Sequence, residues 1–313
     1  MNSAIGALAG LAIAIILITR RFSPVYSLLL GAVAGGLIGG MGLDSTVANM
    51  ISGIKDISPA IIRIIAAGVL SGVLIKTGAA TTISHTIINR LGKQHLFLAL
   101  ALSTMLLCAV GVFIDVAVIT VAPIAIVAAE RMGFSRLKLL LAMVGGGKCG
   151  NIISPNPNTI IAAENFDAPL SSVMAANIVP AVIGLFVTVY VIIPLMSKRY
   201  SNPIAEGANV STNDESLPSF WASIAGPLVV IALLAMRPLV GIAIDPLIAL
   251  PVGGIVGICA TRQWSRTAES ISYGLEKMSV VAVLLVATGA IAGIIKASSL
   301  TDALISVLGQ GEG

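Results

Sequence analysis

The residues most able to bind a ligand are gathered in one stretch, residues 143–163, which reads MVGGGKCGNIISPNPNTIIAA. Its glycines and prolines interrupt a helix inside an otherwise apolar span. Hydrocarbon cannot satisfy the backbone groups that such a break leaves free, so a break at membrane depth lines a cavity or binds a ligand. In secondary transporters these breaks bind substrate and ions. We therefore identify six candidate substrate-binding residues: Lys148, Asn151, Ser154, Asn156, Asn158 and Thr159.

The side chains of this stretch suit an anionic substrate. In a wet cavity the ammonium of Lys148 would attract an anion, whereas a lysine that snorkels from a helix end is the simpler alternative. The polar groups from Asn151 to Thr159 would contact substrate oxygens, and a half-helix beginning near Thr159 would aim its positive end at an anion. A proline-rich external loop is the structural alternative. The GGGK sequence is not a P-loop, because no Ser or Thr follows the lysine.

A second candidate for chemistry is Asp115, within the apolar sequence GVFIDVAVITVAPI. An ionised carboxylate at membrane depth is costly unless it is paired, hydrated or protonated. Burial would favour the protonated form, so Asp115 is the candidate proton-coupling residue. A structural cap at an interfacial turn is the alternative. Of the other charged residues, Arg63 would reach the interface or pair with a carboxylate, and Glu164 would be solvated.

The sequence offers no pattern for metal or covalent chemistry. Cys108, Cys149 and Cys259 lie in apolar stretches and form neither a disulfide framework nor a metal motif. The two histidines, His85 and His95, do not suggest a metal site. We find no nucleophile–base pair, and therefore expect neither an enzyme nor a cofactor.

The composition is that of a membrane protein. Hydrophobic residues make up 57% of the 313 residues and charged residues only 10%, against about 25% charged in soluble domains. The net charge of +4 does not indicate nucleic acid, because the basic residues are scattered in short loops, where they set topology. We therefore predict an all-α polytopic membrane protein that lies in a lipid bilayer.

A spanning helix needs about 20 apolar residues, and several segments come near this length. The run 95–130 would be either a re-entrant hairpin or two spans, with its turn near Gly111–Asp115. Three mixed segments, 44–57, 80–92 and 265–277, are expected to be amphipathic helices at the interface. The expected spans are 4–19, 24–42, 59–76, 95–130, the broken span 139–163, 171–196, 219–238, 244–261 and 279–296.

The charges predict an orientation. Residues 4–19 follow no basic region and precede Arg20 and Arg21, so they are a first transmembrane helix and not a cleaved signal peptide. The N-terminus would then lie outside, in a multi-pass protein of the cell inner membrane. The loops with Asp44 and Asp56, and with Glu164 and Asp167, would also lie outside.

The chain contains an internal repeat. Residues 23–38, SPVYSLLLGAVAGGLI, resemble residues 245–260, DPLIALPVGGIVGICA. At a nearly constant offset, Gly53, Gly68 and Gly72 match Gly274, Gly289 and Gly293. Five spans and a hairpin in the first copy would turn the second copy upside down, which is the usual frame of alternating-access transporters.

The repeat predicts the domain organisation. The first repeat would occupy residues 1–197, a cytoplasmic linker loop 198–218, and a partial second inverted repeat 219–313. Gly309 corresponds to Gly92, so counterparts of the hairpin and the broken helix are missing. We expect the sequence to be C-terminally truncated.

Three motifs together resemble the gluconate permease (GntP) family: GVLIKTGAA, FIDVAVITVAPI and SPNPNTIIAAENF. The family hairpin reads Phe-Phe-acid-Val-Gly-Phe, and its acid falls on Asp115. The family break reads His-Gly-Leu-x-Pro-Pro-His-Pro-Gly-Pro; Pro155 and Pro157 match, whereas Cys149 and Asn156 replace the two histidines.

The resemblance implies a proton symporter for a small organic anion, such as gluconate or another hydroxycarboxylate. Asp115 would carry the proton, and alternating access would come from one unit moving against the other. The alternatives are a sodium-coupled carboxylate transporter or antiporter of the same fold, and a non-functional truncated permease. The chain could also form a homo-oligomer.

Overall fold

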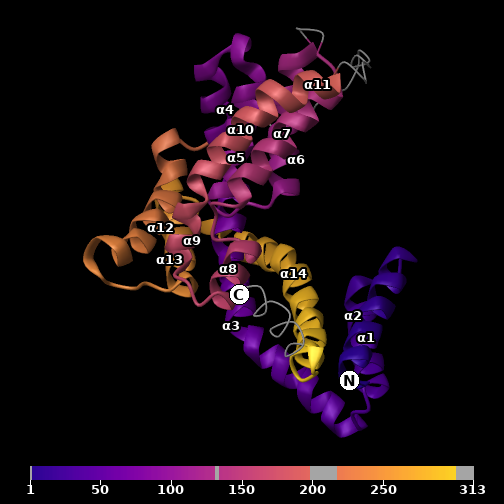
Figure 1. The fold of residues 1–313 in the computed structure, drawn as a ribbon. Helices are drawn as coiled ribbons and strands as arrows, with labels where there is room; N and C mark the ends of the chain where they lie inside the picture. The colour runs from indigo at the N-terminus through magenta and orange to yellow at the C-terminus, as the bar shows by residue number, and fades with distance from the viewer. Residues whose placement is uncertain (1, 131–133, 198–216, 301–313) are drawn as a thin grey trace, which may run out of the picture. The chain divides into compact units, whose positions relative to one another are not determined.

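The computed structural model describes residues 2–130, 134–197 and 217–300 (Figure 1). In these residues the helices are α1 (Asn2–Thr19), α2 (Pro24–Ile38), α3 (Leu43–Lys76), α4 (Ala79–Leu91), α5 (Leu96–Ala109), α6 (Ile114–Glu130), α7 (Arg136–Asn151), α8 (Pro157–Asn165), α9 (Leu170–Ala176), α10 (Ile178–Val187), α11 (Ile193–Ser197), α12 (Phe220–Val240), α13 (Pro246–Thr261) and α14 (Thr267–Lys296). Short 3-10 turns at Lys93–His95 and Trp264–Arg266 precede α5 and α14, and a π-helical turn at Thr188–Ile192 joins α10 to α11.

The helices confirm the all-α membrane fold. Within the described residues, four helical segments are long and apolar enough to cross a membrane: Leu43–Lys76, Leu170–Met196, Phe220–Arg237 and Trp264–Lys296. Helices α1, α2, α5, α6 and α13 are apolar but shorter. In particular, α5 and α6 flank a turn at residues 110–113, where the predicted hairpin has its turn.

Two segments that we expected to be separate interfacial helices are instead continuous with spans. Residues 44–57 form the first half of α3, which passes through Pro59, and most of residues 265–277 lie in α14. A proline removes one helical hydrogen bond and can kink a helix without ending it. The third segment, 80–92, is separate as α4, because Gly78 has a φ of 75° and ends α3.

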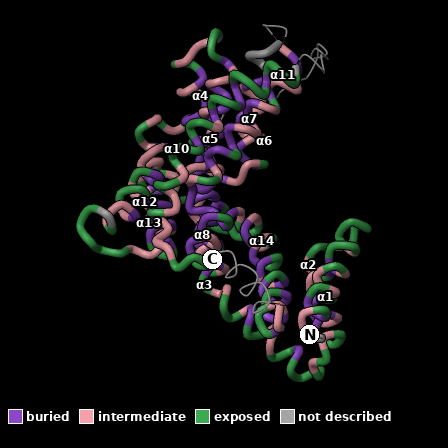
Figure 2. The backbone as a smooth tube through the Cα atoms, viewed as in Figure 1, coloured by how far each residue is buried: buried purple, intermediate pink, exposed green. Residues whose placement is uncertain are grey.

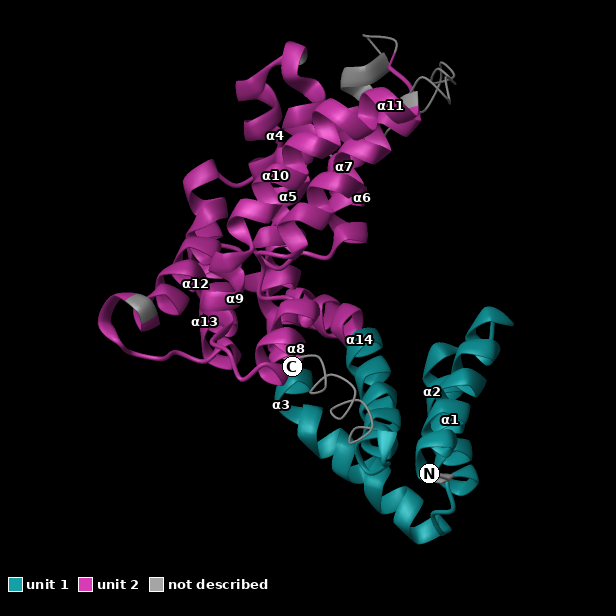
Figure 3. Cartoon of the chain, in the orientation of Figure 1, with its two compact units in different colours: residues 1–62, 279–313 teal, residues 63–278 magenta. Residues whose placement is uncertain are grey.

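The described helices belong to two compact units (Figure 3). Unit 1 comprises residues 1–62 and 279–313, and unit 2 comprises residues 63–278. The predicted domains follow the sequence repeat rather than these units and stay a prediction. Most of the expected linker, 198–216, and the expected match at Gly309 lie outside the described residues.

Unit 1 is packed through glycines. A side chain at Gly10 would collide with the backbone of Gly31 and Gly35, so α1 and α2 approach closely. In the same way, Gly53 of α3 lies against Gly289 and Gly293 of α14. A small core of Ala14, Ala32, Ala290, Ile291 and Ile294 is buried among these helices.

Unit 2 repeats both arrangements. Gly226 of α12 lies against Gly253 and Gly257 of α13, and Gly68 of α3 lies against Gly274 of α14. Helices α5 and α7 add a third close pair, whose inner faces are buried (Figure 2). Thus each matched segment of the sequence repeat makes the same kind of helix contact.

The two contacts between α3 and α14 are related to each other as the sequence repeat predicts. In unit 1, Gly53 packs on Gly289, whereas in unit 2, Gly274 packs on Gly68. In the sequence repeat Gly53 matches Gly274, and Gly289 matches Gly68. The two glycines of one contact are therefore the repeat matches of the two glycines of the other contact. This relation supports the repeat, and the inversion of the second copy stays a prediction.

Candidate functional site

The structure confirms the helix break inside the apolar chain. Helix α7 ends at Asn151 and α8 begins at Pro157, so residues 152–156 are not helical. Pro157 occupies the first helical position of α8, where its missing N–H costs nothing. The break therefore lies where the glycine and proline pattern predicted it.

A network of side chains holds the break in place. Asn156 Oδ1 accepts hydrogen bonds from the backbone N–H of Asn158 (2.7 Å) and Thr159 (3.3 Å), and Thr159 Oγ1 accepts one from the N–H of Asn156 (3.2 Å), which together form a capping box. Asn156 Nδ2 also donates to Asn151 Oδ1 (2.6 Å) and Ser154 Oγ (2.8 Å). Thr159 Oγ1 donates to the Ser154 carbonyl. These bonds occupy the polar groups at the centre of the break.

The six predicted substrate-binding residues therefore fall into two groups. Ser154, Asn156 and Thr159 are buried and bonded to the break itself. Lys148 and Asn158 are exposed and Asn151 is half-buried. Only the second group has side chains open to a ligand in this conformation. The role of all six in binding stays a prediction.

Asp115 does not have the buried environment that the sequence suggested. It lies in the first turn of α6, where the positive end of the helix stabilises a carboxylate, and its side chain is exposed. Asp115 and Lys148 both lie within electrostatic reach of Cys108, on α5. In the described part of the chain no ion pair joins Asp115 to Lys148, so their joint role stays a prediction.

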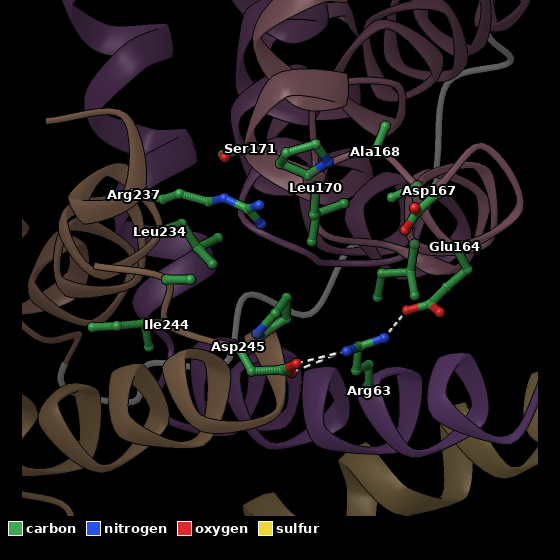
Figure 4. Close-up of a pocket in the computed structure, with 15 residues that line it drawn as sticks. Arg63, Glu164, Asp167, Ala168, Leu170, Ser171, Leu234, Arg237, Ile244 and Asp245 are labelled. Atoms are coloured by element: carbon green, nitrogen blue, oxygen red, sulfur yellow. Dashed lines mark hydrogen bonds and ion pairs between the residues drawn. The ribbon is translucent and has the colours of Figure 1, made fainter. Parts of the chain in front are cut away.

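A cluster of charges that sequence reasoning did not assemble lies in unit 2. The guanidinium of Arg63 donates from Nε to Asp245 Oδ1 (3.0 Å) and from Nη2 to Asp245 Oδ2 (2.6 Å). Its Nη1 forms an ion pair with Glu164 Oε1 (Figure 4). Glu164 is therefore paired, and the expectation that it is merely solvated was wrong: α8 brings it over Arg63.

These residues line a cavity of about 320 Å³. Two further charged residues line it, Asp167 after α8 and Arg237 in the last turn of α12, and the Arg237 side chain extends into the cavity in Figure 4. The apolar part of the wall includes Ile160, Leu170 and Leu234. The cavity is at the small end of the range for ligand pockets, with mixed apolar and charged walls.

The sequence did contain one signal for this site. An arginine inside an apolar span is costly, so it marks a functional pair by default. Its partners could not be recognised, because Asp245 is 182 residues away in the chain. In the described residues, no group of three His, Cys, Asp or Glu side chains could hold a metal ion.

Comparison with known proteins identifies the kind of protein that has this architecture. The model of a family described as GntP family permease matches residues 3–312. An uncharacterized transporter of Haemophilus influenzae is 51% identical over 306 residues, 98% of this chain and 73% of the relative.

Two relatives with assigned substrates are more distant. A high-affinity gluconate transporter of Escherichia coli is 26% identical over 216 residues, which are 67% of this chain and 47% of the relative. A D-serine transporter of Escherichia coli is 24% identical over 337 residues, 98% of this chain and 75% of the relative. The chain thus spans less than half of that gluconate transporter's length in the match.

Proposed function

The chain belongs to the GntP permease family, and on that premise we propose that it moves a small organic anion across the cell inner membrane together with a proton. The observation that carries this proposal is the helix break at residues 152–156 inside an apolar, multi-pass chain. A break of this kind is where secondary transporters bind their cargo. The charged cavity beside α8 adds two guanidinium groups on the same unit.

The names of the relatives narrow the substrate class. Gluconate and D-serine both carry a carboxylate next to a carbon with a polar substituent. We therefore propose a sugar acid or another hydroxycarboxylate as the substrate. Lys148 would supply positive charge, and Asn151 and Asn158 would contact substrate oxygens. Ser154, Asn156 and Thr159 would act mainly by holding the break.

Uptake into proteoliposomes tests this function. The purified protein, including any residues that its gene encodes after Gly313, is reconstituted, an inward proton gradient is imposed, and accumulation of labelled gluconate and D-serine is measured. We expect gluconate to accumulate above its external concentration and a protonophore to abolish the accumulation. Accumulation driven by a sodium gradient at fixed pH would favour the sodium-coupled alternative. If neither gluconate nor D-serine is taken up, the proposal is contradicted.

Asp115 is proposed to carry the coupling proton. Asp115→Asn should abolish proton-driven accumulation while membrane insertion continues, because an amide cannot take up and release the proton. Asp44→Asn is a matched control, since Asp44 is also an exposed carboxylate in the first turn of a helix. Accumulation by Asp115→Asn with an unchanged pH dependence would remove Asp115 from the mechanism.

A further inference from the structure

The donors of Arg63 are divided between two carboxylates. Nε and Nη2 form one edge of the guanidinium, and both bind Asp245. Nη1 is left for Glu164. A guanidinium has five N–H donors in a fixed fork, and a fork occupied on one edge can still bind a carboxylate at the other. The Nη1 end is therefore the part of Arg63 at which partners can change.

The two carboxylates are held to different degrees. Asp245 accepts three hydrogen bonds from Arg63, and its Oδ1 also accepts one from the N–H of Leu247 (2.8 Å) as the N-cap of α13. Glu164 touches Arg63 through one oxygen, from a longer side chain near the end of the nine-residue helix α8. Asp245 is thus fixed by the fold, and Glu164 is free to leave.

A second guanidinium stands ready for a ligand in the same cavity. Arg237 lines the cavity and extends into it (Figure 4), and it forms no ion pair within the described residues. A small carboxylate in the cavity could bind Arg237 and approach Arg63. Besides the two carboxylates that bind Arg63, the wall carries Asp167, which would repel the anion.

We propose that this cavity is an anion-capture site in which the substrate carboxylate takes the place of Glu164 on Arg63 Nη1 and is also bound by Arg237. This inference rests on the proposed function, and it adds where in the fold the substrate carboxylate first binds. It assigns binding to Arg63 and Arg237, which the helix break does not include. The site lies beside the end of α8, which carries Glu164, and beside Asp167 after it, on the side predicted to face outside.

Displacement links anion binding to a proton. Once it leaves Arg63, the Glu164 carboxylate lies near the incoming anion. Asp167, just after α8, and Asp245, just before α13, are further negative charges on the cavity wall. Arg63 from α3 and Arg237 from α12 are the positive groups facing the Glu164 carboxylate. A proton from solvent on the freed Glu164 carboxylate removes the repulsion. Anion binding and protonation of Glu164 therefore favour each other.

Equilibrium binding of gluconate to the purified chain in lipid nanodiscs, measured by calorimetry between pH 5.5 and 8, tests this site. Glu164→Gln removes the competing charge, so we expect binding about fivefold tighter at pH 8, the difference between a charged and a neutral hydrogen-bond partner. The dependence of affinity on pH should flatten in this variant. Arg237→Gln should weaken binding roughly tenfold by removing a charged hydrogen-bond donor.

Two variants serve as controls. Asp167→Asn removes a negative charge from the same wall without freeing Arg63, so it should keep the wild-type pH dependence. Arg90→Gln removes an arginine in the last turn of α4, outside the cavity, and should leave binding unchanged. Thermal unfolding of each variant shows whether it is folded, and Arg63→Lys should weaken binding even when folded, because an ammonium lacks the fork.

The outcomes separate this inference from the proposed function. Binding with these variant effects, but no accumulation in proteoliposomes, would support the capture site and contradict the transport proposal. Accumulation with unchanged affinity in Glu164→Gln and Arg237→Gln would overturn the capture site alone. A wild-type chain that binds no gluconate in nanodiscs would also overturn it.

Discussion

The two contacts between α3 and α14 are built alike, yet the charges beside them differ. In unit 1 Gly53 packs on Gly289, and in unit 2 Gly274 packs on Gly68. Each contact also has a lysine–carboxylate pair: Lys296 with Asp56 in unit 1 and Lys76 with Glu269 in unit 2, both at 2.8 Å. The helix packing has thus been duplicated, whereas the ion pairs differ: at the offset of the glycines, Asp56 corresponds to Lys277 and not to Glu269.

The arginine cluster, by contrast, is present in one copy. At the offset that matches Gly68 with Gly289, Arg63 corresponds to Leu284, and Ser23 precedes Pro24 where Asp245 precedes Pro246. Ser23 forms no side-chain cap bond, whereas Asp245 caps α13. Glycine packing needs only a matching backbone path and survives duplication, while an ion cluster needs particular side chains. The difference indicates that the repeat provides the helix packing of both units, whereas the ion cluster belongs to unit 2 alone among the described residues.

The largest expected effect is a difference in thiol labelling, which tests whether the second copy of the repeat is inverted. Ser45→Cys and Ser265→Cys place thiols at exposed positions in the first turn of α3 and in the 3-10 turn before α14, in a background without Cys108, Cys149 and Cys259. An impermeant maleimide added to intact cells should label the first thiol and leave the second unlabelled until the membrane is permeabilised. Labelling of both from the same side would show that the copies are parallel.

The next effect concerns the duplicated packing. A methyl group at Gly53 would meet the carbonyl of Gly289, and one at Gly274 would meet the carbonyl of Gly68. Each glycine-to-alanine change should therefore destabilise the fold by a similar amount, about 2–3 kcal/mol, as for overpacked cores. Thermal or denaturant unfolding in mild detergent measures both. Gly42→Ala, which meets nothing within 4 Å, is the neutral control; unequal losses at Gly53 and Gly274 would break the equivalence.

A smaller effect distinguishes the charges of the two copies. A double-mutant cycle of Arg63→Gln and Asp245→Asn should give a coupling energy of about 1–2 kcal/mol, between the values for exposed and buried pairs, since their side chains are 24% and 38% exposed. The matched cycle of Leu284→Ala and Ser23→Ala should give less than about 0.5 kcal/mol. Equal coupling energies in the two cycles would show that the two copies of the repeat do not differ at these positions.

The smallest effect concerns the break that positions Glu164. Asn156→Ala removes the N-cap of α8 and should cost about 1 kcal/mol, with faster hydrogen exchange in α8. Asn158→Ala, two residues on, changes an exposed side chain and should leave exchange as it is. If both variants exchange alike, the capping box does not hold the break.

Local features of the sequence were sufficient for much of the fold. The low charge content established the membrane class, and Pro155 and Pro157 placed the break between α7 and α8. The motifs around Asp115 and the break identified the family that the comparison confirmed. These inferences succeeded because hydrophobicity and proline act on the chain near their own positions. The same local view failed at Pro59, where helix α3 continues, because one proline removes a single helical hydrogen bond and need not end a helix.

The composition of the candidate site was decided only by tertiary structure. The sequence placed Ser154, Asn156 and Thr159 among substrate ligands, but their side chains are bonded to the break. It treated Arg63 and Glu164 as separate residues, whereas packing of α3, α8 and the start of α13 makes them one cluster with Asp245. Which side chains face a cavity depends on which helices meet. Helix packing decides this, and it cannot be predicted from the spacing of residues along one helix.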